Sequence, residues 1–365
     1  MNKRYVIIGA GNGGQSLAGD MVLRNAPLSA IYDIDDTAIK SIKKRGGIEM
    51  SGPVVEGFAE IALATSNLEE AIAAGDVFFV CVTAQAYAKF ARQAAPFVKK
   101  NHTYLLIPGY AGSSLMFSKV LEDNGVKELP LIGETASFPY ATRLIEPAHA
   151  GIKARKAVLH IAAYPASRNQ ELFEIVKPAI FEAVLGQDSL SVGCNNVNPA
   201  SHVVPYLMNM DKVEMPRPED FNFHAWGSKT VRKIKLRLDE ERCTIMKAIG
   251  LEAITYKEFM QMSYKGEGYK PIPQKTSDLP PSAGQVPDRF IDEDIPMGVV
   301  PIVDFGRLMG IPTPVSDVMI KLAGLVRDRD FAAEGTTLEK MGLAGLSTSE
   351  ILEKLKTGKT PVKGE

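Results

Sequence analysis

Short apolar runs alternate with segments of helical periodicity through the first half of the chain. Runs such as VFFVCV at 77–82 have the length and composition of buried strands. Strands are predicted at 5–8, 29–32, 77–82, 103–107 and 129–132, with another within 153–163. Helices are predicted between them at 12–24, 36–44, 85–99 and 168–183. This alternation predicts a parallel sheet with helices on both faces.

The pattern changes beyond residues 186–191, where we place a domain boundary. Helical periodicity dominates from there on, in segments at 198–209, 224–249, 256–264, 299–309 and 315–326. A Pro- and Gly-rich stretch at 270–287 interrupts these helices, and a loop of such length in a compact domain is often functional. The sequence thus predicts an α/β domain of residues 1–187 followed by a mostly α-helical domain of residues 188–365.

A glycine cluster joins the first predicted strand to the first predicted helix. Its sequence, GAGNGG from Gly9 to Gly14, fits GxGxxG, in which glycines allow a tight turn, approach of a pyrophosphate and close helix–strand packing. A glycine-rich turn without a ligand is the alternative, but Asp33 follows the second strand, 19 residues beyond Gly14. A carboxylate there accepts hydrogen bonds from ribose hydroxyls and disfavours a 2′-phosphate, so NAD is expected rather than NADP.

These features predict an N-terminal Rossmann dinucleotide-binding domain, and the expected fold class is α/β with a mostly α-helical C-terminal domain. Thr83 and the Pro108-Gly109 pair follow two apolar strands, at the edge where such sheets bind cofactors, although ordinary turns explain these residues equally well. Asp36 is expected to cap the helix after the second strand. The predicted cofactor contacts are Gly9, Gly11, Asn12, Gly13, Gly14, Asp33, Thr83, Pro108 and Gly109.

Composition limits the choice of partners. The 42 basic and 43 acidic residues give a formal net charge of −1, which supplies no electrostatic footprint for nucleic acid or an anionic membrane. No apolar run approaches the roughly 18 residues that suggest a membrane span. Cys81, Cys194 and Cys243 fit neither a disulfide framework nor a zinc site. We expect a cytoplasmic protein that uses no metal; the apolar helical domain is compatible with a homodimer.

Among the five histidines, His202 is distinctive because it follows a dense polar patch, NNVNPAS at 195–201, that opens a predicted helix. His160 lies in an apolar alternation and fits a core position, whereas His102 is expected to be exposed in a turn. A second polar segment, RFIDEDIP at 289–296, follows the Pro- and Gly-rich stretch. A solvated charge run is its simplest interpretation, although functional groups often lie on loops.

Through these residues the chain resembles the opine dehydrogenases, the octopine/nopaline dehydrogenase family, over nearly its whole length. The resemblance rests on GAGNGG at 9–14, YDID at 32–35, IPGYAG at 107–112, IGET at 132–135, NNVNPASH at 195–202, RFIDEDIPMGVVP at 289–301, GIPTP at 310–314 and TLEKMGLAGL at 337–346. It implies an active site in the cleft between the Rossmann domain and the helical domain.

The resemblance also implies roles by position. His202 matches the family's catalytic histidine, Asp294 the aspartate paired with it, and Arg289 an arginine that helps to hold the substrate carboxylate. Further substrate contacts are expected from Glu134, Thr135, Arg143 and Asn198. Arg143 is the best carboxylate clamp among these, since a guanidinium can bind a carboxylate through two parallel hydrogen bonds.

The reaction implied by the resemblance joins an amino acid to a 2-keto acid as an imine, which NADH then reduces. Imidazolium at His202, favoured by the Asp294 carboxylate, would polarise the keto oxygen. One alternative is a reductase like ketopantoate reductase or glycerol-3-phosphate dehydrogenase, classes that commonly use a catalytic lysine. Another is an NAD-binding sensor without catalytic activity.

Overall fold

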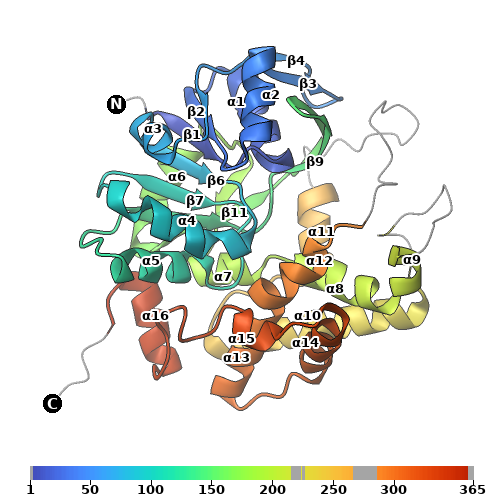
Figure 1. Cartoon of the computed structure of the whole chain (residues 1–365). Coiled ribbons are helices and arrows are strands. Elements are labelled where there is room, and N and C mark those ends of the chain that lie inside the picture. Colours follow the sequence, from blue (N-terminus) through green and yellow to red (C-terminus); the bar gives the residue numbers. More distant parts are fainter. Residues whose placement is uncertain (1–2, 215–222, 224–226, 266–285, 361–365) are drawn as a thin grey trace.

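The computed structural model describes residues 3–214, 223, 227–265 and 286–360 (Figure 1). Most of the Pro- and Gly-rich stretch at 270–287 lies outside these residues. The first part of the helix predicted at 224–249 also lies largely outside them, and the described helix there begins at Lys229.

An eight-stranded sheet forms the centre of the N-terminal half, in the order β12-β11-β8-β7-β6-β1-β2-β5. Neighbouring strands run parallel, except that β11 runs antiparallel to β8. Its strands are β1 (Tyr5–Ile8), β2 (Leu28–Tyr32), β5 (Ala64–Thr65), β6 (Val77–Val80), β7 (Thr103–Leu106), β8 (Leu131–Thr135), β11 (Leu159–Tyr164) and β12 (Ala183–Leu185). The predicted α/β Rossmann fold is confirmed.

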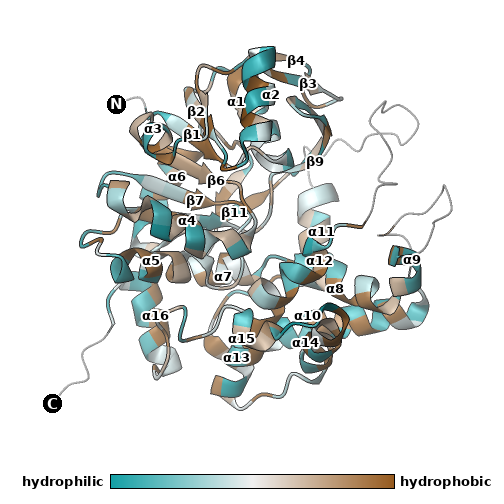
Figure 2. Cartoon of the chain, in the orientation of Figure 1, coloured by the Kyte–Doolittle hydropathy of each residue, from teal (hydrophilic) through white to brown (hydrophobic). Residues whose placement is uncertain are grey.

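Side chains of successive β1 residues lie on opposite faces of this sheet. Tyr5 and Ile7 belong to one apolar cluster, whereas Val6 and Ile8 belong to another. The first cluster includes residues of α1 (Asn12–Leu23), α2 (Asp36–Arg45) and α6 (Asn169–Val176). The second includes residues of α3 (Leu68–Ala73), α4 (Tyr87–Ala94) and α5 (Ser113–Asp123). Figure 2 shows the resulting contrast between the apolar strand β6 and the largely hydrophilic α2.

A second, four-stranded sheet, in the order β4-β3-β10-β9, packs against α1. This sheet was not predicted. Its strands are β3 (Gly47–Ser51), β4 (Gly57–Glu60), β9 (Tyr140–Glu146) and β10 (His149–Arg155). The strand expected over 153–163 is confirmed only in part: β11 covers residues 159–163, whereas residues 153–155 belong to β10 of the other sheet. Asp20 on α1 is fully buried and binds Arg155 of β10 at 2.7 Å, which ties the small sheet to the helix.

Several boundaries also differ from the prediction. The helix expected at 85–99 is one α-helix, α4, flanked by short 3-10 turns at Ala84–Ala86 and Ala95–Phe97, the second of which contains Pro96. The strand expected at 129–132 is β8, which extends to Thr135. The helix expected at 168–183 ends at Val176, and β12 begins at Ala183.

Two residue-level expectations are wrong. Asp35 caps α2 by accepting a hydrogen bond from the Thr37 N–H at 2.9 Å, so Asp36 is the first helical residue. His102 directly precedes β7. It is 3% exposed because its ring packs edge-on against the Phe78 ring of β6. The polar residues before His102 suggested a surface turn, but they gave no sign of this aromatic contact.

The rest of the chain is helical in its described parts. Its helices are α7 (Ser189–Cys194), α8 (Asn198–Met208), α9 (Met210–Glu214), α10 (Lys229–Ile249), α11 (Tyr256–Lys265), α12 (Arg289–Asp292), α13 (Val300–Met309), α14 (Pro314–Arg327), α15 (Phe331–Glu334) and α16 (Thr348–Thr357), with a π-helical turn at Ile295–Val299. Helix α8 packs against α10, α12 and α14. Within the ranges given above, no helix is both long enough and apolar enough to cross a membrane.

Candidate active site

The glycine cluster lies where β1 turns into α1. A Cβ atom on Gly9 would lie 2.8 Å from the Cys81 carbonyl oxygen, and one on Gly14 would lie 1.7 Å from the Gly9 carbonyl oxygen. A Cβ atom on Gly11, in contrast, would meet no described atom within 4 Å. The first two positions therefore require close packing, while the third leaves open space at the positive end of α1, where a pyrophosphate fits.

Asp33 lies directly after β2, beside this turn. Its Oδ2 accepts a hydrogen bond from the Ala10 N–H at 2.5 Å, and its Oδ1 accepts one from the Asp35 N–H at 2.8 Å. The carboxylate is therefore held at the edge of the glycine cluster. Asn12, at the start of α1, donates to the Thr142 carbonyl of β9 at 3.2 Å, so the small sheet supports the same region.

The loops after β6 and β7 meet at the same edge, because the carboxyl ends of parallel strands lie together. Thr83 is exposed after β6. The Pro108 carbonyl after β7 accepts a hydrogen bond from the Tyr87 hydroxyl at 2.7 Å. Gly109 donates its N–H to Thr135 at 2.8 Å, and its carbonyl accepts from the Asn196 side chain at 2.8 Å. The helical domain thus contacts the predicted cofactor loop directly.

His202 and Asp294 are brought together from α8 and from the segment between α12 and the π-helical turn. His202 Nδ1 lies 2.7 Å from Asp294 Oδ2, although 92 residues separate them in the chain. The imidazole is stacked on the Phe290 ring, with the centroids 3.7 Å apart and the planes 9° from parallel. This stacking fixes the ring plane, so the imidazole and the carboxylate form a defined pair.

The acidic segment after α12 is buried against the loops that follow β6 and β7. The Tyr110 hydroxyl, in the loop after β7, donates to Asp294 Oδ1 at 2.6 Å. Glu293 Oε1 accepts the Ala84 N–H at 2.7 Å, and the Gln85 side chain donates to the Asp292 carbonyl. Asp294 is 0% exposed, so its interpretation as part of a solvated charge run is wrong.

Burial determines the electrostatics of this pair. It raises the pKa of Asp294 to about 7, while the Tyr110 hydrogen bond and the Arg289 charge act in the opposite direction. Burial also lowers the pKa of His202 well below its usual range, and the charges of Arg289 and Lys235 add to this effect. Both shifts disfavour separate charges on the two groups, which favours a pair that holds one proton between Nδ1 and Oδ2 and runs against the imidazolium expected from the sequence.

Two cations lie near the imidazole. Arg289 begins α12, with Nη1 3.5 Å from Glu293 Oε2, and its side chain is 46% exposed. Lys235 is on α10, and its ammonium lies 3.7 Å from the centre of the Tyr256 ring. Sequence reasoning missed Lys235, because one lysine among many on an amphipathic helix gives no functional signal.

The other expected substrate residues lie elsewhere around the site. Glu134 and Thr135 are fully buried at the end of β8, where Glu134 Oε1 accepts the Ser114 N–H at 3.3 Å. Arg143 is on β9, opposite Gly151 in the small sheet, and Asn198 begins α8. In the described part of the chain, none of the four forms a hydrogen bond with His202 or Asp294.

Known protein families match both halves of the chain. Residues 186–327 match the family model described as NAD/NADP octopine/nopaline dehydrogenase, alpha-helical domain. Residues 4–107 match one described as NADP oxidoreductase coenzyme F420-dependent. An opine dehydrogenase from Arthrobacter sp. (strain 1C) is 32% identical over 356 residues, which cover 96% of this chain and 98% of that protein. The chain belongs to the opine dehydrogenase family. It is an NAD-dependent oxidoreductase of the class that acts on CH–NH bonds.

A more distant relative agrees with this assignment. Vitopine synthase from Allorhizobium ampelinum is 27% identical to this family member, over 96% of this chain and 99% of that protein. A solved structure of octopine dehydrogenase with NADH and pyruvate is 17% identical over 100% of both chains, with a TM-score of 0.75. That second likeness concerns the fold alone.

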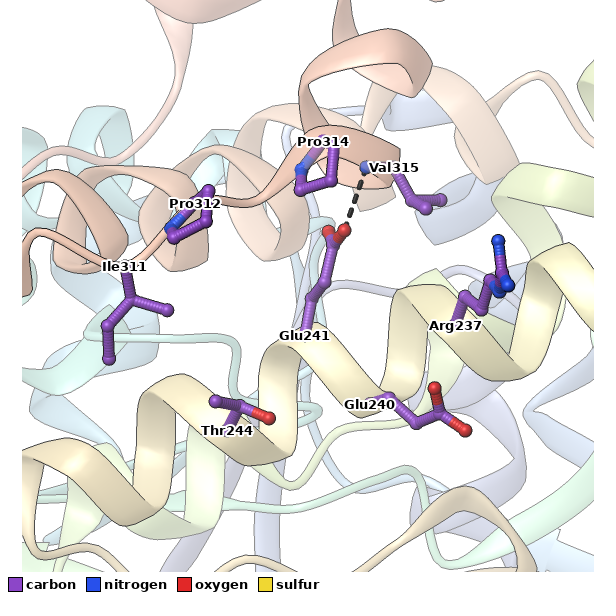
Figure 3. Close-up of a pocket in the computed structure, with 8 residues that line it drawn as sticks. All are labelled: Arg237, Glu240, Glu241, Thr244, Ile311, Pro312, Pro314 and Val315. Carbon is purple, nitrogen blue, oxygen red and sulfur yellow. Dashed lines mark hydrogen bonds between the residues drawn. The ribbon is translucent and has the colours of Figure 1, made fainter.

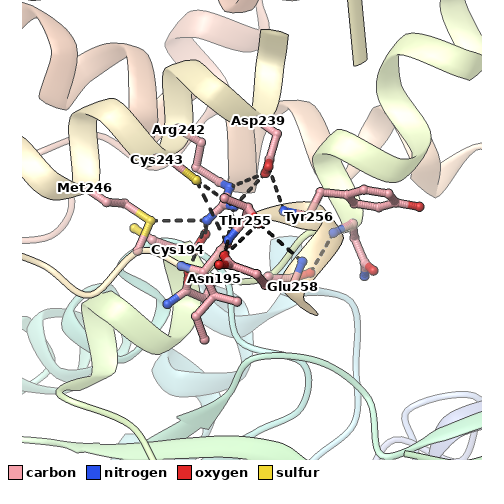
Figure 4. A network of polar contacts seen from close by, with 12 residues as sticks. Cys194, Asn195, Asp239, Arg242, Cys243, Met246, Thr255, Tyr256 and Glu258 are labelled. Atoms are coloured by element: carbon pink, nitrogen blue, oxygen red, sulfur yellow. Dashed lines mark hydrogen bonds and ion pairs between the residues drawn. The ribbon is translucent and has the colours of Figure 1, made fainter. Parts of the chain in front are cut away.

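In this opine dehydrogenase family member, a buried network fixes the junction between α7 and α8 (Figure 4). Arg242 binds Asp239 at 2.6 Å and donates to the Cys194 carbonyl at 3.0 Å and to Asn195 Oδ1 at 3.2 Å. Asp239 Oδ2 in turn accepts the Tyr256 N–H at 2.7 Å. The network holds Asn195 in place, and the next residue, Asn196, reaches the cofactor loop.

A groove of about 300 Å³ lies on another face of α10 (Figure 3). It is lined by Arg237, Glu240, Glu241, Thr244, Ile311, Pro312, Pro314 and Val315. Glu241 accepts the N–H groups of Val315 and Ser316 at 2.8 and 2.9 Å, which caps the start of α14. At 100° per residue, this lining lies on the opposite side of α10 from Lys235. Lys235 is the α10 residue that acts on His202, so the groove is separate from the His202 pair.

Replacement of Glu134 by Gln is expected to stabilise the protein at alkaline pH. Burial raises the pKa of Glu134 to about 8, and Oε2 has no hydrogen-bond partner among the described residues. The folded state holds a proton that the unfolded state loses above about pH 4.3, so the wild type loses stability as pH rises toward 8. The Tm advantage of Glu134→Gln should grow over that range, by roughly 1–2 °C per kcal/mol for a chain of this length.

Thermal unfolding from pH 5 to pH 9 measures this advantage. Glu353→Gln, at an exposed position on α16, is the matched control and should follow the wild type. A Tm difference for Glu134→Gln that stays constant over this pH range would contradict a buried, protonated Glu134.

Proposed function

We propose that this chain catalyses the NADH-dependent joining of an amino acid to a 2-keto acid, forming a secondary amine with at least two carboxylates. The observation that carries the proposal is the 2.7 Å contact between His202 Nδ1 and Asp294 Oδ2, at the edge where the predicted cofactor loops converge. Family membership supplies the reaction class, and this buried pair supplies a proton donor for it.

The residues present fit a dinucleotide. In the proposal, the start of α1 and the space beside Gly11 accept the pyrophosphate, while Asp33 accepts the ribose hydroxyls. The loops carrying Thr83, Pro108 and Gly109 line the remainder of the site. NADH, when bound, supplies the hydride.

The protein's own contribution is to move protons and hold charge. Condensation of the amine with the keto group releases water, and the departing oxygen needs a proton. In the proposal, His202 gives its Nε2–H proton to this oxygen, while the proton shared with Asp294 passes to Nδ1 and leaves Asp294 as the carboxylate. Asp294 orients the imidazole and stabilises its charged form during the transfer.

Two carboxylates on the product call for two cations, and the site provides Arg289 and Lys235 near His202. We propose that Arg289 holds the carboxylate of the keto acid, because it begins the segment that carries Asp294. We propose that Lys235, whose ammonium lies over the Tyr256 ring, accepts the second carboxylate. Arg143, Glu134, Thr135 and Asn198 stay predictions as substrate contacts.

We also propose a cytoplasmic location, which suits a reaction that draws on NADH and a chain whose cysteines are all free. The homodimer stays a prediction. The alternative functions, a simple keto-acid reductase and an NAD sensor, differ from the proposal in their products.

The product distinguishes these functions. NADH oxidation should require an amino acid and a 2-keto acid together. The product mass should equal the sum of both substrates minus water plus two hydrogens. A screen of amino acids against keto acids, read by absorbance of NADH and by mass spectrometry, tests this expectation. A 2-hydroxy acid as the sole product would replace the proposal with simple carbonyl reduction, and no turnover with any pair would favour the sensor.

Replacement of His202 by Gln should lower kcat by roughly 10²–10⁴, the usual contribution of a general acid–base group. NADH affinity, measured by fluorescence titration, should change little, because the pair lies outside the glycine cluster. His160→Gln, on β11 of the large sheet, is the matched control and should keep near-normal kcat. A His202→Gln protein with near-normal kcat would show that the imidazole is structural.

Replacement of Asp33 by Asn should reduce the preference for NADH over NADPH. The amide can still accept the Ala10 N–H, but it no longer repels a 2′-phosphate. The ratio of kcat/KM for the two cofactors measures the effect. Asp123→Asn, at an exposed position on α5, should leave the ratio at its wild-type value. An unchanged ratio in Asp33→Asn would mean that another group selects the cofactor.

A further inference from the structure

Tyr110 connects the loop after β7 to the pair formed by His202 and Asp294. It follows Gly109 in the loop between β7 and α5 and is 1% exposed. Its hydroxyl donates to Asp294 Oδ1 at 2.6 Å, while its N–H donates to Ser113 Oγ at 3.0 Å. The residue therefore links a loop of the Rossmann domain to a carboxylate of the helical domain, across 184 positions of sequence.

Close packing leaves the Tyr110 side chain little freedom. A Cβ atom on Gly193 of α7 would lie 2.3 Å from the Tyr110 carbonyl oxygen. A Cβ atom on Gly298, in the π-helical turn, would lie 3.4 Å from Tyr110 Cδ1 and 2.3 Å from Pro199 Cγ. Both glycines allow neighbouring elements to close around the tyrosine, so its hydroxyl is held against Asp294.

The charges around Asp294 show why this hydroxyl matters. His202, from α8, engages Oδ2, and Glu293, the adjacent residue, adds a carboxyl that disfavours a second negative charge. Arg289 acts from its own segment, but its side chain is 46% exposed and bridges to Glu293. Lys235, from α10, acts on the imidazole. Among the described residues, Tyr110 is therefore the donor that satisfies Oδ1.

We propose that Tyr110 is a positioning residue for the reaction: its hydroxyl fixes the Asp294 carboxylate so that Oδ2 meets His202 Nδ1. This inference rests on the proposed function, because it assigns the pair a role in proton transfer. Tyr110 also favours the ionised carboxylate, since it donates a hydrogen bond to that form. It thereby sets the pH range over which the pair keeps its shared proton.

Removal of the Tyr110 hydroxyl should raise the pH at which the pair loses its proton. Without the hydroxyl, Oδ1 is left buried and unpaired, and the pKa of Asp294 rises further above its ordinary value. The pair then keeps its shared proton to higher pH. The midpoint at which the proton is lost should rise by about one pH unit, the size expected for a hydrogen bond to a charged group.

Titration of the His202 imidazole by ¹⁵N NMR measures this midpoint without substrate or turnover, with His202→Gln used to assign the signal. In the wild type the proton of the pair should be lost near pH 7, and in Tyr110→Phe about one unit higher. Tyr87→Phe is the matched control. It removes another buried hydroxyl, bonded to the neighbouring Pro108 carbonyl at 2.7 Å, and should leave the midpoint unchanged.

Equal midpoints in the wild type and Tyr110→Phe would overturn the inference, as would equal shifts in Tyr110→Phe and Tyr87→Phe. If Tyr110→Phe does not fold, 3-fluorotyrosine at position 110 provides the second test. Its more acidic hydroxyl is a stronger donor and should lower the midpoint, and an unchanged midpoint would contradict the role. Because the titration needs no substrate, failure of the proposed reaction would leave this result interpretable.

Discussion

The contact between His202 and Asp294 is the interaction on which the rest of the site depends. A buried carboxylate is costly unless hydrogen-bonded partners surround it. Here the imidazole satisfies one oxygen and Tyr110 the other, at 2.7 and 2.6 Å. The two partners come from different domains, so both Asp294 oxygens are hydrogen-bonded only where the helical domain meets the carboxyl edge of the sheet.

This requirement explains several features that surround the pair. Glu293 anchors the acidic segment to the loop after β6, and Asn196 anchors the start of α8 to the loop after β7. The buried Arg242 network holds the residue next to Asn196. Each link crosses or supports the boundary between the domains, and together they place a proton-sharing pair beside the region that fits a dinucleotide.

Local signals in the sequence were sufficient for much of the fold. The glycine cluster, the alternation of strands and helices, and the polar patch before His202 each arise within a few residues. The small sheet was missed because it joins β3 to β10, about a hundred positions apart, through short strands with weak patterns. Tyr110 and Lys235 were missed for a related reason: their roles come from long-range contacts, which a single sequence does not reveal.

The central claim is that His202 and Asp294 act as one unit, and a double-mutant cycle tests it most directly. The kcat of the reductive reaction would be measured for His202→Gln, Asp294→Asn and the combination. If the residues share one proton and one task, the double variant should be about as slow as the slower single variant. A double variant slowed by the product of the two single effects would show that the residues act independently, which would contradict the account.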